Sequence, residues 1–333
     1  MLNVKSNFDN SNPGSLEEWN NNLAKCINAN IFSTWEWGEY KNVGWKLERL
    51  AFYNGDHFVG MIQILFKKMG PFKLGWSSSG INLVNYSYLE EIVEALSQHY
   101  DLKKAIIRIN FFDEAIGDNQ FYIDAVSAFR SPVVSINSGY TIRFDLNNYA
   151  NSPKTYSSNN RYYLGKAVKN NLHFEVAPFT PKEFCEIHNS MASLKDLNHL
   201  EVREDDLAKL HNLFSEQLFV AKVSHAEEML AMCAVIRWRN KAYYFLAGAN
   251  ENGRKLSASF LMVNKLIDYL KLAGVEEFDF GGITPFKQSA IGVNRFKIGF
   301  NGRIIRYAGE RDLTANKFLY WGFNLLLRFK KIG

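Results

Sequence analysis

Two stretches of the chain share one order of apolar and polar positions. Residues 47–76 predict a strand, a turn, a longer apolar strand, a basic turn and a third strand, and residues 217–248 repeat that order. Met61 in the first stretch corresponds to Met232 in the second, an offset of 171 residues (232 − 61). The repetition predicts two copies of one domain.

The repeat continues beyond these strands. Each stretch is followed by an amphipathic helix and then by a further strand, at 105–111 and 276–282. Each half then ends in a strand-like segment, at 138–146 and 302–313. The apolar positions that define the two helices are Leu89, Ile92, Val93 and Leu96, and Phe260, Val263, Leu266, Ile267 and Leu270. This order predicts an α+β fold, with mixed sheets and helices.

A polar spacer separates the two halves. The segment NNYANSPKTYSSNN, residues 147–160, contains Pro153 and few apolar side chains, as domain boundaries often do. We therefore expect the first domain to span residues 1–148 and the second to span residues 149–313.

The stretch 278–313 concentrates the features that point to a ligand. A predicted strand, FDF, stops on Gly281-Gly282, and a glycine pair at a strand end lets the backbone approach a ligand closely. Further on, Lys297 lies between aromatic residues, where it is well placed to meet an anionic substrate. Asn301-Gly302 predicts a hairpin turn before the last strand.

Composition places the chain among ordinary globular proteins. It has 333 residues, 47% of them hydrophobic and 22% charged, which is enough for two domains. Residues 1–150 carry 13 Lys and Arg against 16 Asp and Glu, a net charge of −3, whereas residues 151–333 carry 26 against 18, a net charge of +8. The basic second half indicates either a phosphate-bearing partner or a merely soluble basic surface.

Cysteine and histidine give no sign of a metal or a cofactor. Cys26, Cys185 and Cys233 are odd in number and not spaced as metal ligands, which favours a reducing compartment. The N-terminus is polar and lacks the apolar core of a signal peptide, and no run has the roughly 18 apolar residues that span a bilayer. We expect a cytoplasmic protein without a metal site.

The C-terminal segment FLYWGFNLLLRFKK, residues 318–331, leaves two interpretations open. One is a helix at the inner face of the membrane, with Trp321 at headgroup level and Arg328, Lys330 and Lys331 on lipid phosphates. The other is a C-terminal helix that packs on the protein's own core.

The order of predicted elements resembles the acetyltransferase (GNAT) fold, the fold of acyl-CoA N-acyltransferases. This resemblance implies a sheet that splays between its fourth and fifth strands, which in the second half are residues 243–249 and 277–282. In a GNAT domain the loop after the fourth strand is glycine-rich and holds a pyrophosphate at a helix N-terminus. Here that loop, NENGRKLSAS at 250–259, has one glycine and two cations, which departs from the acetyl-CoA motif.

Three segments resemble the FemABX family, the Fem-type aminoacyl- and peptidyltransferases. The first, FSTWEWGEYKNVGWKLERLAFYNGDHFVGMIQILFKK, contains Trp35 and Lys41 in a Trp-x-x-x-x-x-Lys pattern. The second is NNRYYLGKAVKNNLHFEV, with Arg161, and the third is DFGGITPFKQSAIGVNRFKIGFNG. The resemblance covers nearly the whole chain. It implies two tandem GNAT-like domains, with a C-terminal helix at 314–333 that returns to the first.

Some members of the family carry a long coiled-coil arm in the second domain. Residues 181–215 predict only two short helices here, so the chain is similar to the compact, monomeric members.

The resemblance also implies roles for individual residues. Lys41, on a short helix that we expect to be opened by a capping box of Ser33 and Glu36, would contact the diphosphate of an acceptor. Arg161 would face the same diphosphate from the second domain. Lys297 would meet the 3′ end of an acyl-carrying RNA, while Phe296 can stack on a base.

Further candidates surround these residues. Asp279 either orients an incoming amine or caps its loop through backbone N–H groups. The other expected substrate-binding residues are Trp35, Gly281 and Gly282. The expected donor-binding residues are Arg254, Lys255, Arg295 and Arg303.

By the same resemblance we expect an N-acyltransferase that moves an aminoacyl group from aminoacyl-tRNA to an amine of a cell-envelope precursor. That precursor is a muropeptide or an amino sugar of a surface polysaccharide. Two alternatives stay open: an acyl-CoA-dependent N-acyltransferase in surface polysaccharide biosynthesis, and a non-catalytic protein that binds a carrier or a glycan.

Overall fold

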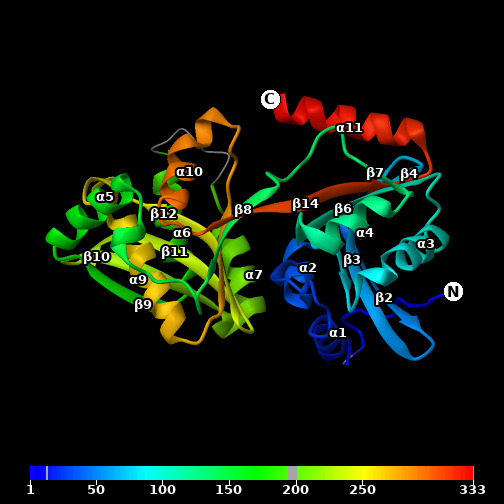
Figure 1. Ribbon diagram of the computed structural model, residues 1–333, viewed down its shortest axis with the longest axis horizontal. Helices are drawn as coiled ribbons and strands as arrows, with labels where there is room; N and C mark the ends of the chain where they lie inside the picture. Colours follow the sequence, from blue (N-terminus) through cyan, green and yellow to red (C-terminus); the bar gives the residue numbers. More distant parts are fainter. Residues whose placement is uncertain (13, 194–200, 333) are drawn as a thin grey trace. The chain divides into compact units, whose positions relative to one another are not determined.

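The computed structural model describes residues 1–12, 14–193 and 201–332 (Figure 1). The chain divides into two compact units. Unit 1 contains residues 1–139 and the chain from Arg306 onward, and unit 2 contains Tyr140–Ile305.

The main sheet of unit 1 has the strand order β1-β2-β3-β4-β6-β14, with β5 paired to β3 and β7 paired to β14. β4 and β6 are parallel, and the other pairs are antiparallel. The strands are β1 (Asn3–Lys5), β2 (Lys46–Asn54), β3 (His57–Met69), β4 (Phe72–Ser77), β5 (Ile81–Leu83), β6 (Ala105–Glu114), β7 (Phe129–Arg130) and β14 (Arg303–Leu313). The first three residues of β14 belong to unit 2 and the rest to unit 1.

Helices cover this sheet and complete its core. In α3 the predicted apolar positions are all buried, so the amphipathic pattern is confirmed. The helices of unit 1 are α1 (Ser15–Leu23), α2 (Trp35–Lys41), α3 (Leu89–His99), α4 (Gly117–Ala125) and α11 (Lys317–Ile332), with short 3₁₀ turns at Ile31–Ser33 and Tyr86–Tyr88.

The sheet of unit 2 has the order β8-β13-β12-β11-β10-β9, in which β12 and β13 form the parallel pair. Its strands are β8 (Tyr140–Asp145), β9 (His173–Pro178), β10 (Leu218–His225), β11 (Glu228–Trp238), β12 (Lys241–Ala249) and β13 (Glu277–Gly282). Within the described chain, the mixed α+β architecture predicted from the sequence is therefore present in both units.

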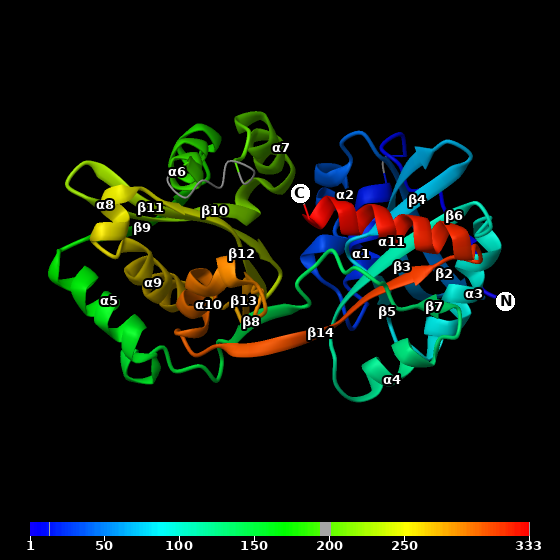
Figure 2. The same cartoon turned by 90° about the horizontal axis from the view of Figure 1, so that it is seen from above.

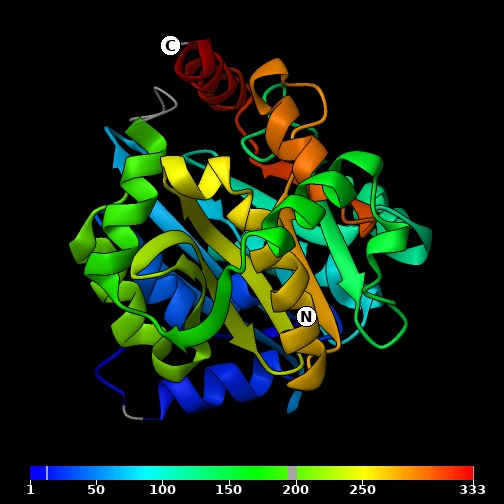
Figure 3. The ribbon, with the colours of Figure 1, turned by 90° about the vertical axis from the view of Figure 1, so that its left-hand side faces the viewer.

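Helices lie on both faces of the unit 2 sheet. Seen from above, α6 and α7 lie on one side of the strands and α5 and α9 on the other (Figure 2). Figure 3 looks onto the side where α9 crosses the strands. The helices are α5 (Ser158–Lys169), α6 (Pro181–Ser193), α7 (Glu204–Phe214), α8 (Glu251–Lys255), α9 (Ala258–Leu272) and α10 (Ile291–Ile298), with 3₁₀ turns at Pro153–Thr155, Ser215–Gln217 and Gln288–Ala290.

The register of the strands reproduces the offset between the halves. In unit 1, Ala51 of β2 lies opposite Met61 of β3. In unit 2, Lys222 of β10 lies opposite Met232 of β11, and both members of this pair stand 171 residues after their counterparts (222 − 51 and 232 − 61). The predicted strand repeat is therefore a repeat of structure.

The last strands of the two halves are exchanged. β8 ends the first half in sequence but pairs with β13 in unit 2. β14 ends the second half but pairs with β6 in unit 1, where Asp312 lies opposite Arg108. The units consequently divide at 139/140 and 305/306, rather than at the expected 148/149 and 313/314. A strand-like segment at the end of a half carries no signal for the sheet that it joins.

A buried ionic cluster fixes β14 in unit 1. The Arg108 guanidinium is fully buried, and its Nε and Nη2 atoms donate to the two carboxylate oxygens of Asp312 at 2.7 and 2.8 Å. Glu310 lies 3.3 Å from Nη1 of the same guanidinium. Asn324 of α11 accepts from Nη2 at 3.0 Å. Charge-assisted bidentate pairs of this kind are geometrically specific, so the cluster selects one strand register.

Two local predictions are wrong. The N-cap of α2 is Thr34, whose hydroxyl accepts from the Trp37 backbone N–H at 3.2 Å, whereas the Ser33 hydroxyl donates to Asn82. The Phe296-Lys297 segment is helical, so Asn301-Gly302 closes no hairpin and instead joins α10 to β14. Asn301 does adopt the left-handed backbone expected of a turn residue, with φ of 63°.

α11 packs on unit 1, as the returning C-terminal helix was expected to do. Phe323 and Asn324 are buried, and the Tyr320 hydroxyl donates to the Ser131 carbonyl at 2.7 Å. Among the described residues, no helix combines the length and the apolar character needed to cross a membrane.

The Arg108→Ala variant should lose about 3–5 kcal/mol of unfolding free energy, because it leaves the buried carboxylates of Glu310 and Asp312 without their cation. Urea unfolding measures this loss. Lys46→Ala is the matched control, because Lys46 is 76% exposed in its pair with Glu48 and should change stability by less than about 1 kcal/mol. Equal stabilities of the two variants would contradict the role given to the cluster.

Candidate functional site

The parallel strands β12 and β13 separate partway along their length. Their pairing runs from Lys241 opposite Glu277 to Tyr243 opposite Asp279. β12 then continues along β11 to Ala249, while Gly282 of β13 pairs with Thr141 of β8. The predicted splay between the fourth and fifth strands is therefore present in unit 2.

Gly281 lies at the mouth of this splay and must be a glycine. Its φ is +82°, in the left-handed region. A Cβ atom there would lie 3.1 Å from Lys297 Nζ and 3.2 Å from the Tyr244 carbonyl oxygen. The glycine pair was expected to let a ligand approach the strand. In the structure it lets the ammonium of Lys297 approach β13.

Two buried asparagines place α10 beside the splay. Asn294 accepts from the Thr284 backbone N–H at 3.1 Å and donates to the Thr284 carbonyl at 2.8 Å, which ties the helix to the loop after β13. Asn160 of α5 donates to the Phe296 carbonyl at 2.9 Å. Gly299 leaves the room for Asn160, because a Cβ there would meet its amide at 2.3 Å.

Lys297 extends from α10 into the splay. Its Nζ donates to the Gly282 carbonyl at 3.1 Å and lies 5.5 and 5.8 Å from the ring centroids of Phe280 and Tyr244. Burial against these rings lowers the pKa of the Lys297 ammonium from 10.5 to about 8, and the charge of Asp279 opposes that shift. The site therefore holds an amine that loses its proton as the pH rises through about 8.

Asp279 caps the strand end, one of its two predicted roles. Its Oδ1 accepts from the Gly281 backbone N–H at 2.8 Å and from the Thr141 hydroxyl at 2.6 Å. Its Oδ2 lies 3.3 Å from Nε of Arg143. The carboxylate is buried and fixes the strand end on which Lys297 rests.

Phe296 packs into the core of unit 2. Its ring centroid lies 5.0, 5.3 and 5.9 Å from those of Phe260, Phe300 and Phe280. These contacts position α10 and leave base stacking by Phe296 as an untested prediction. Phe286, on the loop between β13 and α10, is 89% exposed and offers a more open aromatic face.

The cations expected to bind the donor occupy several places. Arg254 and Lys255 end α8, where Lys255 forms an exposed ion pair with Glu251 at 2.7 Å. Arg295 is exposed on α10, and its role toward a donor stays a prediction. The structure does not bring Arg303 to this group.

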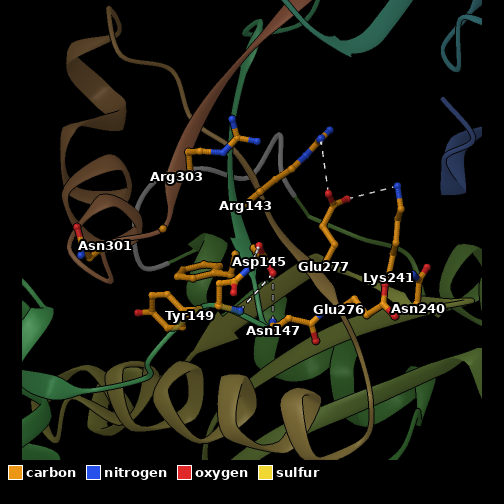
Figure 4. Close-up of a pocket in the computed structure, with 13 residues that line it drawn as sticks. Arg143, Asp145, Asn147, Tyr149, Asn240, Lys241, Glu276, Glu277, Asn301 and Arg303 are labelled. Atoms are coloured by element: carbon orange, nitrogen blue, oxygen red, sulfur yellow. Dashed lines mark hydrogen bonds and ion pairs between the residues drawn. The ribbon is translucent and has the colours of Figure 1, made fainter. Parts of the chain in front are cut away.

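Arg303 lines a separate cavity of about 590 Å³ at the first residues of β12 and β13 (Figure 4). Here Glu277 lies 3.6 Å from Lys241 and 3.9 Å from Arg143. The cavity therefore lies toward the end of β13 opposite Gly282, and its charges are largely paired with one another. We place the candidate site at the splay instead.

The loop 250–259 carries its own helix cap and packs against β11. Asn250 caps α8 by accepting from the Gly253 backbone N–H at 2.7 Å. A Cβ at Gly253 would lie 2.0 Å from the Leu230 carbonyl oxygen, so this glycine serves packing against β11. The departure from the acetyl-CoA motif is thus structural as well as compositional.

The expected acceptor residues of unit 1 lie on α2. Lys41 is exposed in the last turn, with Nζ 4.7 and 5.0 Å from the ring centroids of Tyr40 and Trp37. Trp35 is buried, and the Arg49 guanidinium stacks 3.5 Å from its ring centroid. This burial favours a packing role for Trp35. Trp37 of the same helix is buried as well.

Arg161 is exposed in the first turn of α5. Its Nη1 donates to the Tyr156 carbonyl at 2.8 Å and to the Lys154 carbonyl at 3.3 Å, which orients the guanidinium. Its role toward a phosphate stays a prediction.

Sequence reasoning missed the residues that surround Lys297 or hold its helix in place. Tyr244, Phe280, Asn160 and Asn294 read in sequence as ordinary strand and helix positions. Only the alternation around FDFGG could have singled out Phe280 as one of two inward aromatic residues. In the part of the chain that the structure describes, no three His, Cys, Asp or Glu side chains gather where a metal ion could bind.

Comparison with known proteins shows which family the chain is similar to. A family model described as the FemAB family matches residues 180–328. Aminoacyltransferase FemB of Staphylococcus epidermidis is 31% identical over 108 residues, which are 31% of this chain and 26% of FemB. The crystal structure of FemX has a TM-score of 0.77 at 17% identity and covers 92% of this chain and 98% of that one. The chain is thus similar to the FemAB family over residues 180–328 and shares the fold of FemX.

The chain matches about a quarter of the length of its curated relative FemB. Its fold is confirmed as tandem GNAT-like. A tandem GNAT protein from the clavulanic acid biosynthesis pathway has a TM-score of 0.53 at 11% identity and covers 94% of this chain and 98% of that one.

A titration of Lys297 tests the site without reference to any reaction. After reductive methylation with ¹³C, one lysine resonance should titrate near the pKa of about 8 that burial gives this amine. That resonance should be absent from the spectrum of the Lys297→Arg variant. A Lys297 resonance that titrates near 10.5 would contradict the described burial of the amine.

Proposed function

We propose that this chain transfers an aminoacyl group from aminoacyl-tRNA to an amine of a cell-envelope precursor, a muropeptide or an amino sugar of a surface polysaccharide. The family relationship supports aminoacyl transfer, since the relative FemB is named an aminoacyltransferase. The observation that carries the proposal is a half-buried ammonium, Lys297, held at the mouth of a GNAT-type splay.

The proposed chemistry is the attack of a neutral amine on the acyl ester of the donor. A C–N bond forms, the C–O bond to the terminal ribose breaks, and the proton of the amine passes through solvent to the leaving ribose oxygen. Negative charge develops on the carbonyl oxygen and on the leaving oxygen. Lys297, in its ammonium form, stabilises these charges, and the hydrogen bond to the Gly282 carbonyl holds it in place.

The donor is proposed to be aminoacyl-tRNA, and two features of the second half support this choice. The Gly253 N–H of α8 is taken by the Asn250 side chain. The second half of the chain carries a net charge of +8, which suits a polyanion. The competing proposal is an acyl-CoA donor in surface polysaccharide biosynthesis, because the 3′-phosphate of CoA also attracts cations. The third candidate function is that of a non-catalytic protein that binds a carrier or a glycan.

The acceptor is proposed to carry a diphosphate, and each of Lys41 and Arg161 is proposed to contact a phosphate. Lysine serves as a point charge toward phosphate, and arginine as a bidentate donor. We further propose that the protein acts as a monomer in the cytoplasm, where charged tRNA is available, and at the inner face of the membrane.

A direct contest of donors tests the proposed function. The purified chain is incubated with envelope precursors and either charged tRNA or acyl-CoA, and products are identified by mass spectrometry. We expect an amide product from charged tRNA alone. Transfer from acyl-CoA with charged tRNA ignored would contradict the donor, and no product from either would favour the binding protein.

The Lys297→Ala variant should lower kcat on the order of a hundredfold, because one positioned electrostatic contact lowers the barrier by roughly 3 kcal/mol. Lys297→Arg retains a cation that does not lose its proton at ordinary pH. In the wild type, kcat/KM should fall as pH rises through about 8, where the ammonium is lost, and the Arg variant should lack this limb. Near-normal turnover of a folded Lys297→Ala protein would refute the assignment.

The Lys41→Ala variant should raise the KM for the acceptor by about tenfold or more, since a charge-assisted contact contributes about 1.5–3 kcal/mol. The effect should shrink at high salt. Lys25→Ala, a change at another unit 1 lysine, is the control and should leave the KM unchanged. An unchanged KM in Lys41→Ala would rule out the contact.

A further inference from the structure

The outward side of α11 is as apolar as its buried side. Five large side chains on this surface are between 48 and 90% exposed. They recur at helical spacing along one face, which we call the α11 face: Phe318, Trp321, Leu325, Leu326 and Phe329. Packing against unit 1 leaves them uncovered, because Phe323 and Asn324 are the side chains that turn inward. Single exposed apolar residues are ordinary, but a contiguous stripe marks an interaction surface.

The α11 face continues into an apolar groove within unit 1. The groove has a volume of about 360 Å³ and runs between α11 and the β3–β4 hairpin. Met69, Phe72 and Leu74 of the hairpin line it opposite Phe318 and Leu326. Met69 is itself 44% exposed, so the apolar surface extends from the helix onto the hairpin.

The charges around this surface have one sign. The hairpin carries three exposed lysines, Lys67, Lys68 and Lys73, and the segment 65–76 contains no Asp or Glu. α11 likewise contains no acidic residue, and Lys317 and Arg328 are exposed beside the apolar stripe. An apolar helix face bordered by cations has the composition of a helix that lies in the plane of an anionic bilayer.

We propose that the α11 face and the β3–β4 hairpin dock on a bilayer of anionic phospholipids. The five apolar side chains enter the boundary between headgroups and acyl chains, and the groove receives part of one acyl chain. The hairpin lysines contact lipid phosphates. A second copy of the chain fits less well, because a symmetric contact would bring the same lysines together without an acidic partner.

This inference does not depend on the proposed transfer reaction, because docking needs neither a donor nor an acceptor. Vesicle flotation of the full chain tests it. The wild type should float with vesicles of phosphatidylcholine containing about 30% phosphatidylglycerol and bind much less to phosphatidylcholine alone.

The triple variant Phe318→Ser/Leu325→Ser/Phe329→Ser should lower the partition coefficient by about a hundredfold or more, because three large side chains no longer enter the apolar layer. Lys67→Gln/Lys68→Gln should lower it by about fivefold per lysine on anionic vesicles only. The matched control is Phe121→Ser/Leu272→Ser, which removes two side chains that are 70% and 90% exposed elsewhere and should bind as the wild type does.

The triple variant should fold, because its substitutions are at exposed positions. Circular dichroism and thermal unfolding check this. Equal flotation of triple variant and wild type would overturn the proposal. Failure of the wild type to bind anionic vesicles would also overturn it. This holds whether the wild type is a monomer in sedimentation or a dimer that the triple variant no longer forms.

Discussion

The guanidinium of Arg108 is the contact on which the arrangement of the chain depends. It binds Asp312 through two nitrogens, lies beside Glu310 and donates to the Val134 carbonyl at 2.6 Å. Glu310 in turn accepts from two backbone N–H groups just before the chain leaves unit 1 at residue 139, those of Ile136 and Asn137. The cluster therefore fixes both places where the chain passes between the units, and with them the exchange of the last strands.

The same exchange determines what lies next to the splay. Because β14 must return to unit 1, the segment between β13 and β14 stays in unit 2 and carries α10. Asn160 and Asn294 hold that helix so that Lys297 rests on the end of β13. The pairing of β14 in unit 1 thus leaves Lys297 beside the splay between β12 and β13 of unit 2. In a GNAT-type fold this splay is the place that receives an acyl donor.

Sequence patterns predicted what depends on local order. The strand repeat, the faces of α3 and α9 and the glycine at the mouth of the splay follow from apolar periodicity and from the backbone demands of glycine, whereas the splay itself was expected from the resemblance to the GNAT fold. The strand exchange could not be predicted, because β8 and β14 carry no local signal for their partners. The contact of Lys297 with aromatic rings and the pairing of Asp279 with Thr141 and Arg143 could not be predicted either, because they join residues far apart in sequence. The predicted N-cap of α2 was wrong by one position, because Ser33 and Thr34 can both cap a helix. The Ser33 hydroxyl bonds to Asn82 instead, and Thr34 is left as the cap.

The central claim is that the acyl-bearing end of a tRNA enters the splay beside Lys297. Photo-crosslinking measures this most directly, with a tRNA that carries 2-azidoadenosine at its 3′ terminus and a non-hydrolysable aminoacyl amide. Digestion and mass spectrometry locate the adduct. The account predicts adducts confined to residues 243–249 and 278–300 of unit 2, which unlabelled charged tRNA suppresses and CoA does not. Adducts elsewhere in the chain, or labelling that CoA suppresses and charged tRNA does not, would contradict it.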